Sequence, residues 1–109
     1  MNVLEKIRKQ VETNPVIIYM KGTPQMPQCG FSANASAALT NTGLPFAYVN
    51  VLEDPWIYEK LPSFADWPTF PQIFVGGELL GGSDIVVAMS KEGSLKPVVE
   101  AAIAKSENE

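Results

Sequence analysis

The chain has 109 residues, 46% hydrophobic and 18% charged, and this length and composition predict one globular domain over residues 1–109. Twelve acidic against eight basic residues give a net charge of −4, which disfavours nucleic acid because phosphate binding needs clustered basic side chains. The longest apolar runs, 16–20 and 85–89, are far shorter than the roughly 20 residues of a membrane span. The start MNVLEKIRKQ also lacks the apolar core of a secretory signal, and a single cysteine fits a reducing compartment. We therefore expect a cytoplasmic protein with neither nucleic acid nor membrane among its partners.

The first half of the chain predicts helices and strands in alternation. Apolar residues at helical spacing predict a helix from Val3 to the pair Asn14-Pro15. The nearly continuous apolar run VIIYMK, residues 16–21, predicts a strand buried on both faces. A loop with two prolines and a glycine follows over 22–28, and an alanine-rich helix over 31–42 then ends at Gly43.

The second half predicts another strand, a hairpin and three more helices. FAYVNV at 46–51 is a strand, and Asp54 caps a helix that has Pro55 in its first turn and reaches about residue 64. Residues 72–75 and 78–80 predict an antiparallel hairpin turned by two glycines. Ser83 and Asp84 are expected to cap the next helix, a last helix starts after residue 93, and the tail from about 105 is expected to fray.

This order of elements predicts an α/β fold with a four-stranded mixed sheet flanked by helices on both faces. A strand, helix and strand come first and require a right-handed crossover, and the hairpin then extends the sheet. Ligands of such folds gather beyond the carboxyl ends of the parallel strands. Cys29, which follows the first strand and the loop 22–28, is therefore expected in the functional site.

Cys29 is the only cysteine of the chain, and the chain contains no histidine. At the entrance to a helix its thiolate is favoured by the unpaired amides of the first turn, and Lys21 can add a positive charge; the alternative is a buried cysteine acting as a small hydrophobe. The absence of histidine excludes a Cys–His catalytic pair and histidine-ligated metals. Ser32 stands where a Cys-x-x-Cys motif has its second thiol, so redox chemistry needs a thiol from another molecule.

Three separated motifs resemble one known family. CGFS at 29–32, MKGTPQMPQ before it and WPTFPQIFVGGELLGGSDI at 67–85 are similar to the CGFS-type monothiol glutaredoxins in their short single-domain bacterial form, and the match runs from about residue 14 to 93. The resemblance implies a thioredoxin-like (glutaredoxin) fold, glutathione binding, and a 2Fe-2S cluster shared by a homodimer. It also implies transfer of that cluster to iron–sulfur acceptor proteins and pairing with a BolA-type protein.

The resemblance also assigns roles to single residues. Cys29 becomes the cluster ligand, and it is the nucleophile if the protein is an oxidoreductase. Lys21 meets the glycine carboxylate of glutathione. Thr69, Phe70 and Pro71 match a Thr-x-Pro segment with a cis-proline, in which the middle residue pairs its main chain with the glutathione cysteine.

A helix start and a tyrosine complete the implied glutathione site. The helix start at Gly82 and Ser83 suits the carboxylate of the γ-glutamyl residue of glutathione. Asp84 suits the ammonium group of that γ-glutamyl residue. Relatives commonly carry an arginine where this chain has Tyr58, which supplies one hydrogen bond instead of a charged fork. Glutathione is then bound more weakly, or Lys60 or Gln28 compensates.

Each of these residues also has an ordinary structural interpretation. Lys21 is then a solvated residue at a strand end, Pro71 a proline between loop and strand, and Tyr58 a packing residue of an amphipathic helix. Residues 81–84 are in that interpretation a plain turn followed by a helix cap.

Three functions are compatible with the sequence. A 2Fe-2S cluster takes four terminal ligands, so two chains with one cysteine each need two glutathione thiols, which suits a cluster carrier. The second function is a glutathione-dependent oxidoreductase in which Cys29 removes glutathione from protein mixed disulfides. The carrier is favoured because the loop 22–28 is longer than in efficient dithiol relatives. The third is an adaptor in which Cys29 plays no part.

Overall fold

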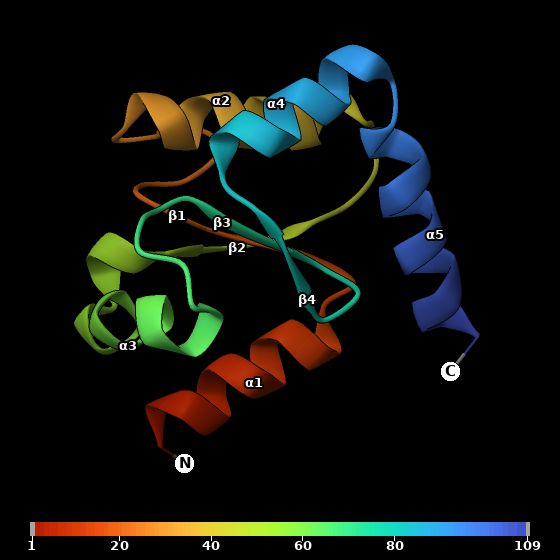
Figure 1. Ribbon diagram of the computed structural model, residues 1–109. Helices are drawn as coiled ribbons and strands as arrows, with labels where there is room; N and C mark the ends of the chain where they lie inside the picture. The colour runs from red at the N-terminus through yellow and green to blue at the C-terminus, as the bar shows by residue number, and fades with distance from the viewer. Residues whose placement is uncertain (1, 109) are drawn as a thin grey trace.

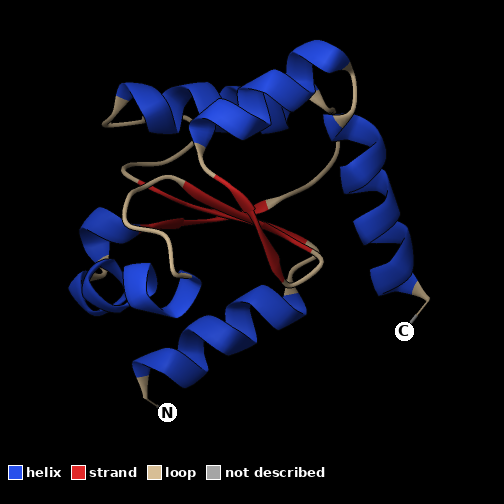
Figure 2. Cartoon of the chain, viewed as in Figure 1, coloured by secondary structure: helices blue, strands red, loops and turns tan. Residues whose placement is uncertain are grey.

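The computed structural model describes residues 2–108 and confirms the predicted α/β fold (Figures 1 and 2). Its elements in chain order are α1 (Val3–Thr13), β1 (Val16–Met20), α2 (Gly30–Asn41), β2 (Ala47–Asn50), the 3-10 turn η1 (Val51–Glu53), α3 (Pro55–Ala65), β3 (Gln72–Val75), β4 (Glu78–Gly81), α4 (Ser83–Glu92) and α5 (Leu95–Glu107). None of the helices within residues 2–108 is both long and apolar enough to cross a membrane.

The four strands form one mixed sheet in the order β2-β1-β3-β4. β1 pairs in parallel with β2, with Ile18 opposite Tyr48, and antiparallel with β3, with Ile18 opposite Ile73. β4 pairs antiparallel with β3 through the predicted hairpin. β1 is therefore a central strand, and its carboxyl end leads straight into the loop that carries Cys29.

Helices cover both faces of the sheet and give it two cores (Figure 1). Val16, Ile18 and Met20 of β1 pack with α2, α4 and α5, whereas Ile17 and Tyr19 pack with α1 and α3. All five side chains are buried, as the apolar run predicted. Burying a side chain of this size contributes about 1.5 to 3 kcal/mol, so the sheet is a rigid support for the loops at its edge.

The boundaries differ from the predictions in two places. β2 ends at Asn50, because the Asn50 side chain accepts a hydrogen bond from the Leu52 amide (3.1 Å) and turns the chain into η1. The cap of α4 is Gly82, and neither Ser83 nor Asp84 caps the helix with its side chain. α5 is helical to Glu107, and fraying of the tail from about residue 105 stays a prediction.

The cap of α4 packs directly against the segment 67–71. A Cβ at Gly82 would lie 3.4 Å from the Trp67 indole nitrogen and 3.4 Å from the Pro71 carbonyl oxygen, which is ordinary van der Waals contact. The start of α4 and this segment are therefore neighbours in the structure. The prediction that Asp54 caps α3 is confirmed, since its carboxylate accepts from the Ile57 amide (3.1 Å).

Candidate functional site

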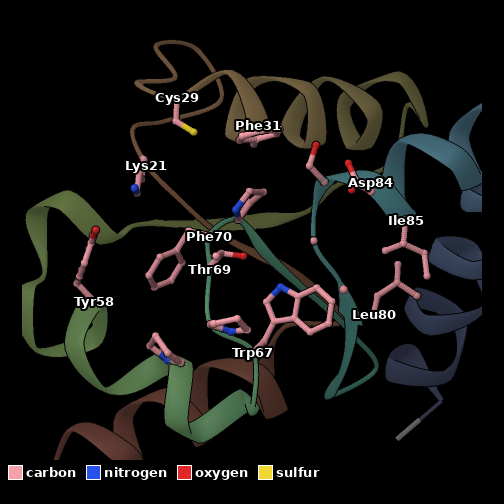
Figure 3. Close-up of a pocket in the computed structure, with 16 residues that line it drawn as sticks. Lys21, Cys29, Phe31, Tyr58, Trp67, Thr69, Phe70, Leu80, Asp84 and Ile85 are labelled. Atoms are coloured by element: carbon pink, nitrogen blue, oxygen red, sulfur yellow. The ribbon is translucent and has the colours of Figure 1, made fainter.

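A pocket of about 850 Å³ opens beyond the carboxyl end of β1 (Figure 3). It is lined by the nine residues that the sequence predicted for the site, namely Lys21, Cys29, Tyr58, Thr69, Phe70, Pro71, Gly82, Ser83 and Asp84. Seven further residues, almost all apolar, complete the lining: Phe31, Pro62, Trp67, Pro68, Leu80, Gly81 and Ile85. Segments far apart in the sequence thus meet in one concave site.

The pocket has a polar group at each end and an aromatic wall between them. Figure 3 shows Cys29 and Lys21 at one end and Asp84 at the other, with Phe31 between them and Phe70 and Trp67 below. Asp84 is exposed in the first turn of α4, where backbone amides lack helical partners. A ligand with a thiol, an anionic group and a zwitterionic end matches this arrangement.

Cys29 is the N-cap of α2, and its thiol is only partly buried. The amide of Ser32 is the main cause that lowers the pKa of Cys29 below its ordinary value. The Phe31 amide, the Ser32 hydroxyl and the charge of Lys21 lower this pKa further, against a partial desolvation that raises it. The predicted thiolate at a helix entrance thus owes more to the first-turn donors than to Lys21.

Ser32 has a role that the sequence did not reveal. It is fully buried, and its hydroxyl oxygen accepts a hydrogen bond from the Lys21 amide (3.1 Å). The same residue therefore ties the end of β1 to the start of α2 and donates to the Cys29 sulfur. Its place three residues after a cap residue, where amides point back at the cap, is the signal that could have identified it.

Replacing Ser32 with alanine is expected to raise the pKa of Cys29, because the hydroxyl donor is lost while the backbone donor stays. At a pH below this pKa the thiolate fraction falls, so alkylation of Cys29 by iodoacetamide should slow about threefold there. The pH dependence of the alkylation rate measures the shift. Ser36→Ala, one turn along the same helix, is the control and should leave the rate unchanged. Equal pH profiles for Ser32→Ala and the wild type would contradict this role.

The loop that presents Cys29 is fixed by hydrogen bonds. The Gln28 amide donates to the Lys21 carbonyl (2.9 Å), and Thr23 and Met26 bond to each other through both backbone groups. The Gly22 amide donates to the Asn50 side chain (2.9 Å), which also binds the Leu52 amide. The proline-rich loop is therefore a defined turn that holds the thiol toward the pocket.

Lys21, Tyr58 and Phe70 form one stacked group on the pocket wall. The Lys21 ammonium nitrogen lies 5.8 Å from the centroid of the Tyr58 ring, a cation–π distance. The Tyr58 ring packs on the Phe70 ring with centroids 5.2 Å apart. Neither Lys60 nor Gln28 lines the pocket, and both are exposed, so the suggested compensation by these two side chains finds no support in this arrangement.

The segment 69–71 enters the pocket through a cis peptide bond between Phe70 and Pro71, as the resemblance implies. Gln72, next in the chain and fully buried, fixes this segment from behind. Its side-chain amide donates to the Trp67 carbonyl (2.9 Å) and the Thr69 carbonyl (3.3 Å). In the sequence, Gln72 looks like an ordinary first residue of a strand, so this role was not predicted.

Replacing Gln72 with methionine, which has a similar length, is expected to lower the free energy of unfolding by about 1 to 2 kcal/mol. Two hydrogen bonds are lost, while the Gln72 side-chain oxygen, which has no partner within residues 2–108, is removed as well and offsets part of the cost. Urea unfolding measures the change. Gln25→Met, in the exposed loop, should leave stability unchanged, and an unchanged stability of Gln72→Met would show that Gln72 does not hold the segment 67–69.

Cys29 is the only thiol that this chain could offer to a metal ion. Within residues 2–108, no group of three or more histidine, cysteine, aspartate or glutamate side chains lies close enough to hold a metal ion. Cys29, half-exposed and with a lowered pKa, has the donor chemistry that iron–sulfur clusters require. The remaining ligands of a cluster would have to come from outside the chain.

Comparison with known proteins identifies the family. The family model described as glutaredoxin matches residues 16–80, which include β1, the Cys29 loop and the sheet up to β4. The curated Glutaredoxin 4 of Haemophilus influenzae strain 86-028NP is 50% identical over 105 residues, covering 96% of this chain and 98% of its own. The chain belongs to the glutaredoxin family. With one cysteine, it is a monothiol glutaredoxin.

Solved structures agree with this assignment. Reduced apo GrxS14 of poplar is 40% identical with a TM-score of 0.77, and the match covers 92% of each chain. A buckwheat glutaredoxin solved as a glutathione complex has a TM-score of 0.78 over 91% of this chain and 88% of its own. At 22% identity, that second likeness concerns the fold alone. The predicted thioredoxin-like glutaredoxin fold is confirmed.

Proposed function

We propose that this glutaredoxin binds glutathione in the pocket and, as a homodimer, carries a 2Fe-2S cluster that it transfers to acceptor proteins in the cytoplasm. The observation that carries the proposal is the half-exposed Cys29, with a lowered pKa, at one end of a pocket whose other end bears Asp84 and a helix start. Among residues 2–108 there is no second thiol to complete either a disulfide or a cluster.

Glutathione fits the pocket group by group. Its γ-glutamyl end carries an ammonium and a carboxylate, which suit Asp84 and the free amides at the start of α4. Its glycine carboxylate then falls at the opposite end, near Lys21. Its thiol lies beside Cys29, and the backbone of Phe70 faces the middle of the tripeptide. The buckwheat glutaredoxin in complex with glutathione supports this fit at the level of the fold.

The cluster is cargo in this proposal. Two copies of Cys29 and two glutathione thiols supply four terminal ligands, so the cluster itself joins the two subunits. Ligands that are partly small molecules exchange readily, which favours delivery to an acceptor protein. A BolA-type protein in place of one subunit is part of the same proposal, carried over from the sequence resemblance.

Anaerobic reconstitution with iron, sulfide and glutathione tests this function. The expected product is a coloured dimer, detected by visible absorption and sizing, which reverts to a colourless monomer on chelation. The same mixture without glutathione should give neither colour nor dimer, because two cluster ligands are then missing. A colourless monomer in the presence of excess glutathione would rule out the carrier.

A second function is favoured by the lowered pKa of Cys29. The thiolate can attack the glutathione sulfur of a protein mixed disulfide, which releases the protein as a thiolate and leaves a disulfide between Cys29 and glutathione. A second glutathione thiolate then attacks the glutathione sulfur, yielding glutathione disulfide and free Cys29. Turnover of a glutathionylated protein comparable to that of dithiol glutaredoxins would favour this function over the carrier.

A further inference from the structure

Apart from the Cys29 thiol, the pocket lining contains one positive and one negative side chain. These are Lys21 and Asp84, and Figure 3 shows them at opposite ends. Glutathione has two carboxylates and one ammonium group. Asp84 and the start of α4 match the zwitterionic γ-glutamyl end, which leaves Lys21 as the only charged side chain of the lining available to the glycine carboxylate.

The surroundings of Lys21 are aromatic. Its ammonium nitrogen lies 5.8 Å from the centroid of the Tyr58 ring, and that ring is supported by Phe70. α3 holds Tyr58 in place, since the Tyr58 amide donates to the Asp54 carbonyl (2.9 Å). Lys60 lies two residues further along the same helix, so it points to another side of the helix. It is exposed and does not reach the lining.

We propose that Tyr58 sets the ligand specificity of this end of the pocket, so that the protein accepts γ-glutamyl-cysteinyl thiols whose C-terminal end is uncharged. The inference rests on the proposed glutathione site. The Tyr58 hydroxyl can donate one hydrogen bond to an ester or amide carbonyl as readily as to a carboxylate. A guanidinium fork at this position would instead favour the carboxylate through two charge-assisted bonds.

Lys21 distinguishes a carboxylate from an ester only modestly. The single Lys21 cation in an open pocket is screened by solvent, and it also makes a cation–π contact with the Tyr58 ring. Both effects weaken its attraction for a carboxylate. We therefore expect glutathione to bind only about threefold more tightly than its glycine ethyl ester. Lys21→Met is expected to remove that difference and give a ratio of dissociation constants near one.

The test compares reduced glutathione with its glycine ethyl ester in the full chain. Dissociation constants are measured by calorimetry for the wild type, Tyr58→Arg and Tyr58→Phe. We expect the ester-to-acid ratio to rise about tenfold in Tyr58→Arg, because the fork binds only the carboxylate. Tyr58→Phe keeps the ring on Phe70 and is expected to retain the low ratio. The ester itself should bind all three proteins within about threefold, which reports that the rest of the pocket is intact.

The possible failures are distinguishable. If glutathione binds but Tyr58→Arg shows the ratio of the wild type, or if the wild type already rejects the ester about thirtyfold, the specificity inference is overturned while the glutathione site stands. If Lys21→Met keeps the original ratio, Lys21 does not read the carboxylate and the inference is likewise wrong. If neither ligand binds any of the proteins, the proposed site fails, and this inference fails with it.

Discussion

Replacing Cys29 with serine is expected to abolish cluster binding, cluster-dependent dimerisation and any reduction of mixed disulfides. Serine removes the only thiol of the chain, and a hydroxyl is neither a cluster ligand of this type nor a redox partner. The fold should persist, because the Cys29 side chain is only partly buried and makes little contribution to the core. Visible absorption and sizing after anaerobic reconstitution measure the loss.

Thermal unfolding and glutathione titration are the controls for Cys29→Ser. The variant should unfold like the wild type and still bind glutathione without a covalent bond, since Lys21, Phe70 and Asp84 are unchanged. An adaptor in which Cys29 is incidental makes the opposite prediction, that every partner interaction survives the substitution. A coloured dimer formed by Cys29→Ser would therefore contradict the whole account of the site.

Among substitutions that add a single methyl group, Gly22→Ala is expected to lower the free energy of unfolding the most. Gly22 has φ +93°, and an added Cβ would lie 2.5 Å from the Met26 carbonyl oxygen and 2.6 Å from the Gln28 nitrogen. Left-handed strain of about 1 kcal/mol combines with a backbone clash that costs about 1 to 3 kcal/mol. We expect a total loss of about 3 kcal/mol in the free energy of unfolding, measured in urea.

Gly43→Ala is the matched control for Gly22→Ala. Gly43 also has positive φ, +74°, but an added Cβ there would meet no atom within 4 Å. Its cost should therefore be the strain alone, about 1 kcal/mol, with no change in Cys29 alkylation. Gly22→Ala should in addition weaken glutathione binding about tenfold, because the loop that presents Cys29 must move. Equal effects of the two substitutions would show that the loop does not depend on this close approach.

The sequence was informative wherever a local pattern decides the structure. The apolar run of β1 predicted a strand with two buried faces, and the order of elements placed Cys29 beyond its carboxyl end. The resemblance then collected residues from four distant segments, and the structure brings all nine into one pocket. The strand order and the short connections between elements determine which edge of the sheet each of these residues reaches. They therefore leave few alternative arrangements of the nine side chains.

What the sequence could not supply depends on contacts between distant segments. Ser32 gains its role by bonding to the end of β1, and Gln72 by reaching back to Trp67 and Thr69. Gly82, and neither Ser83 nor Asp84 as predicted, is the cap of α4, and it lies against Trp67 and Pro71. The relative weight of Lys21 and the α2 amides on the pKa of Cys29 depends in the same way on distances that no spacing rule gives.

The central claim is that the lone Cys29 requires ligands from outside the chain. The most direct measurement is the composition of the reconstituted, purified dimer, with iron, sulfide, glutathione and protein quantified after acid release. We expect about two iron, two sulfide and two glutathione per two chains, as four terminal thiolates demand. A cluster that retains its colour in a dimer free of glutathione, or a cluster held by a single chain, would contradict the claim.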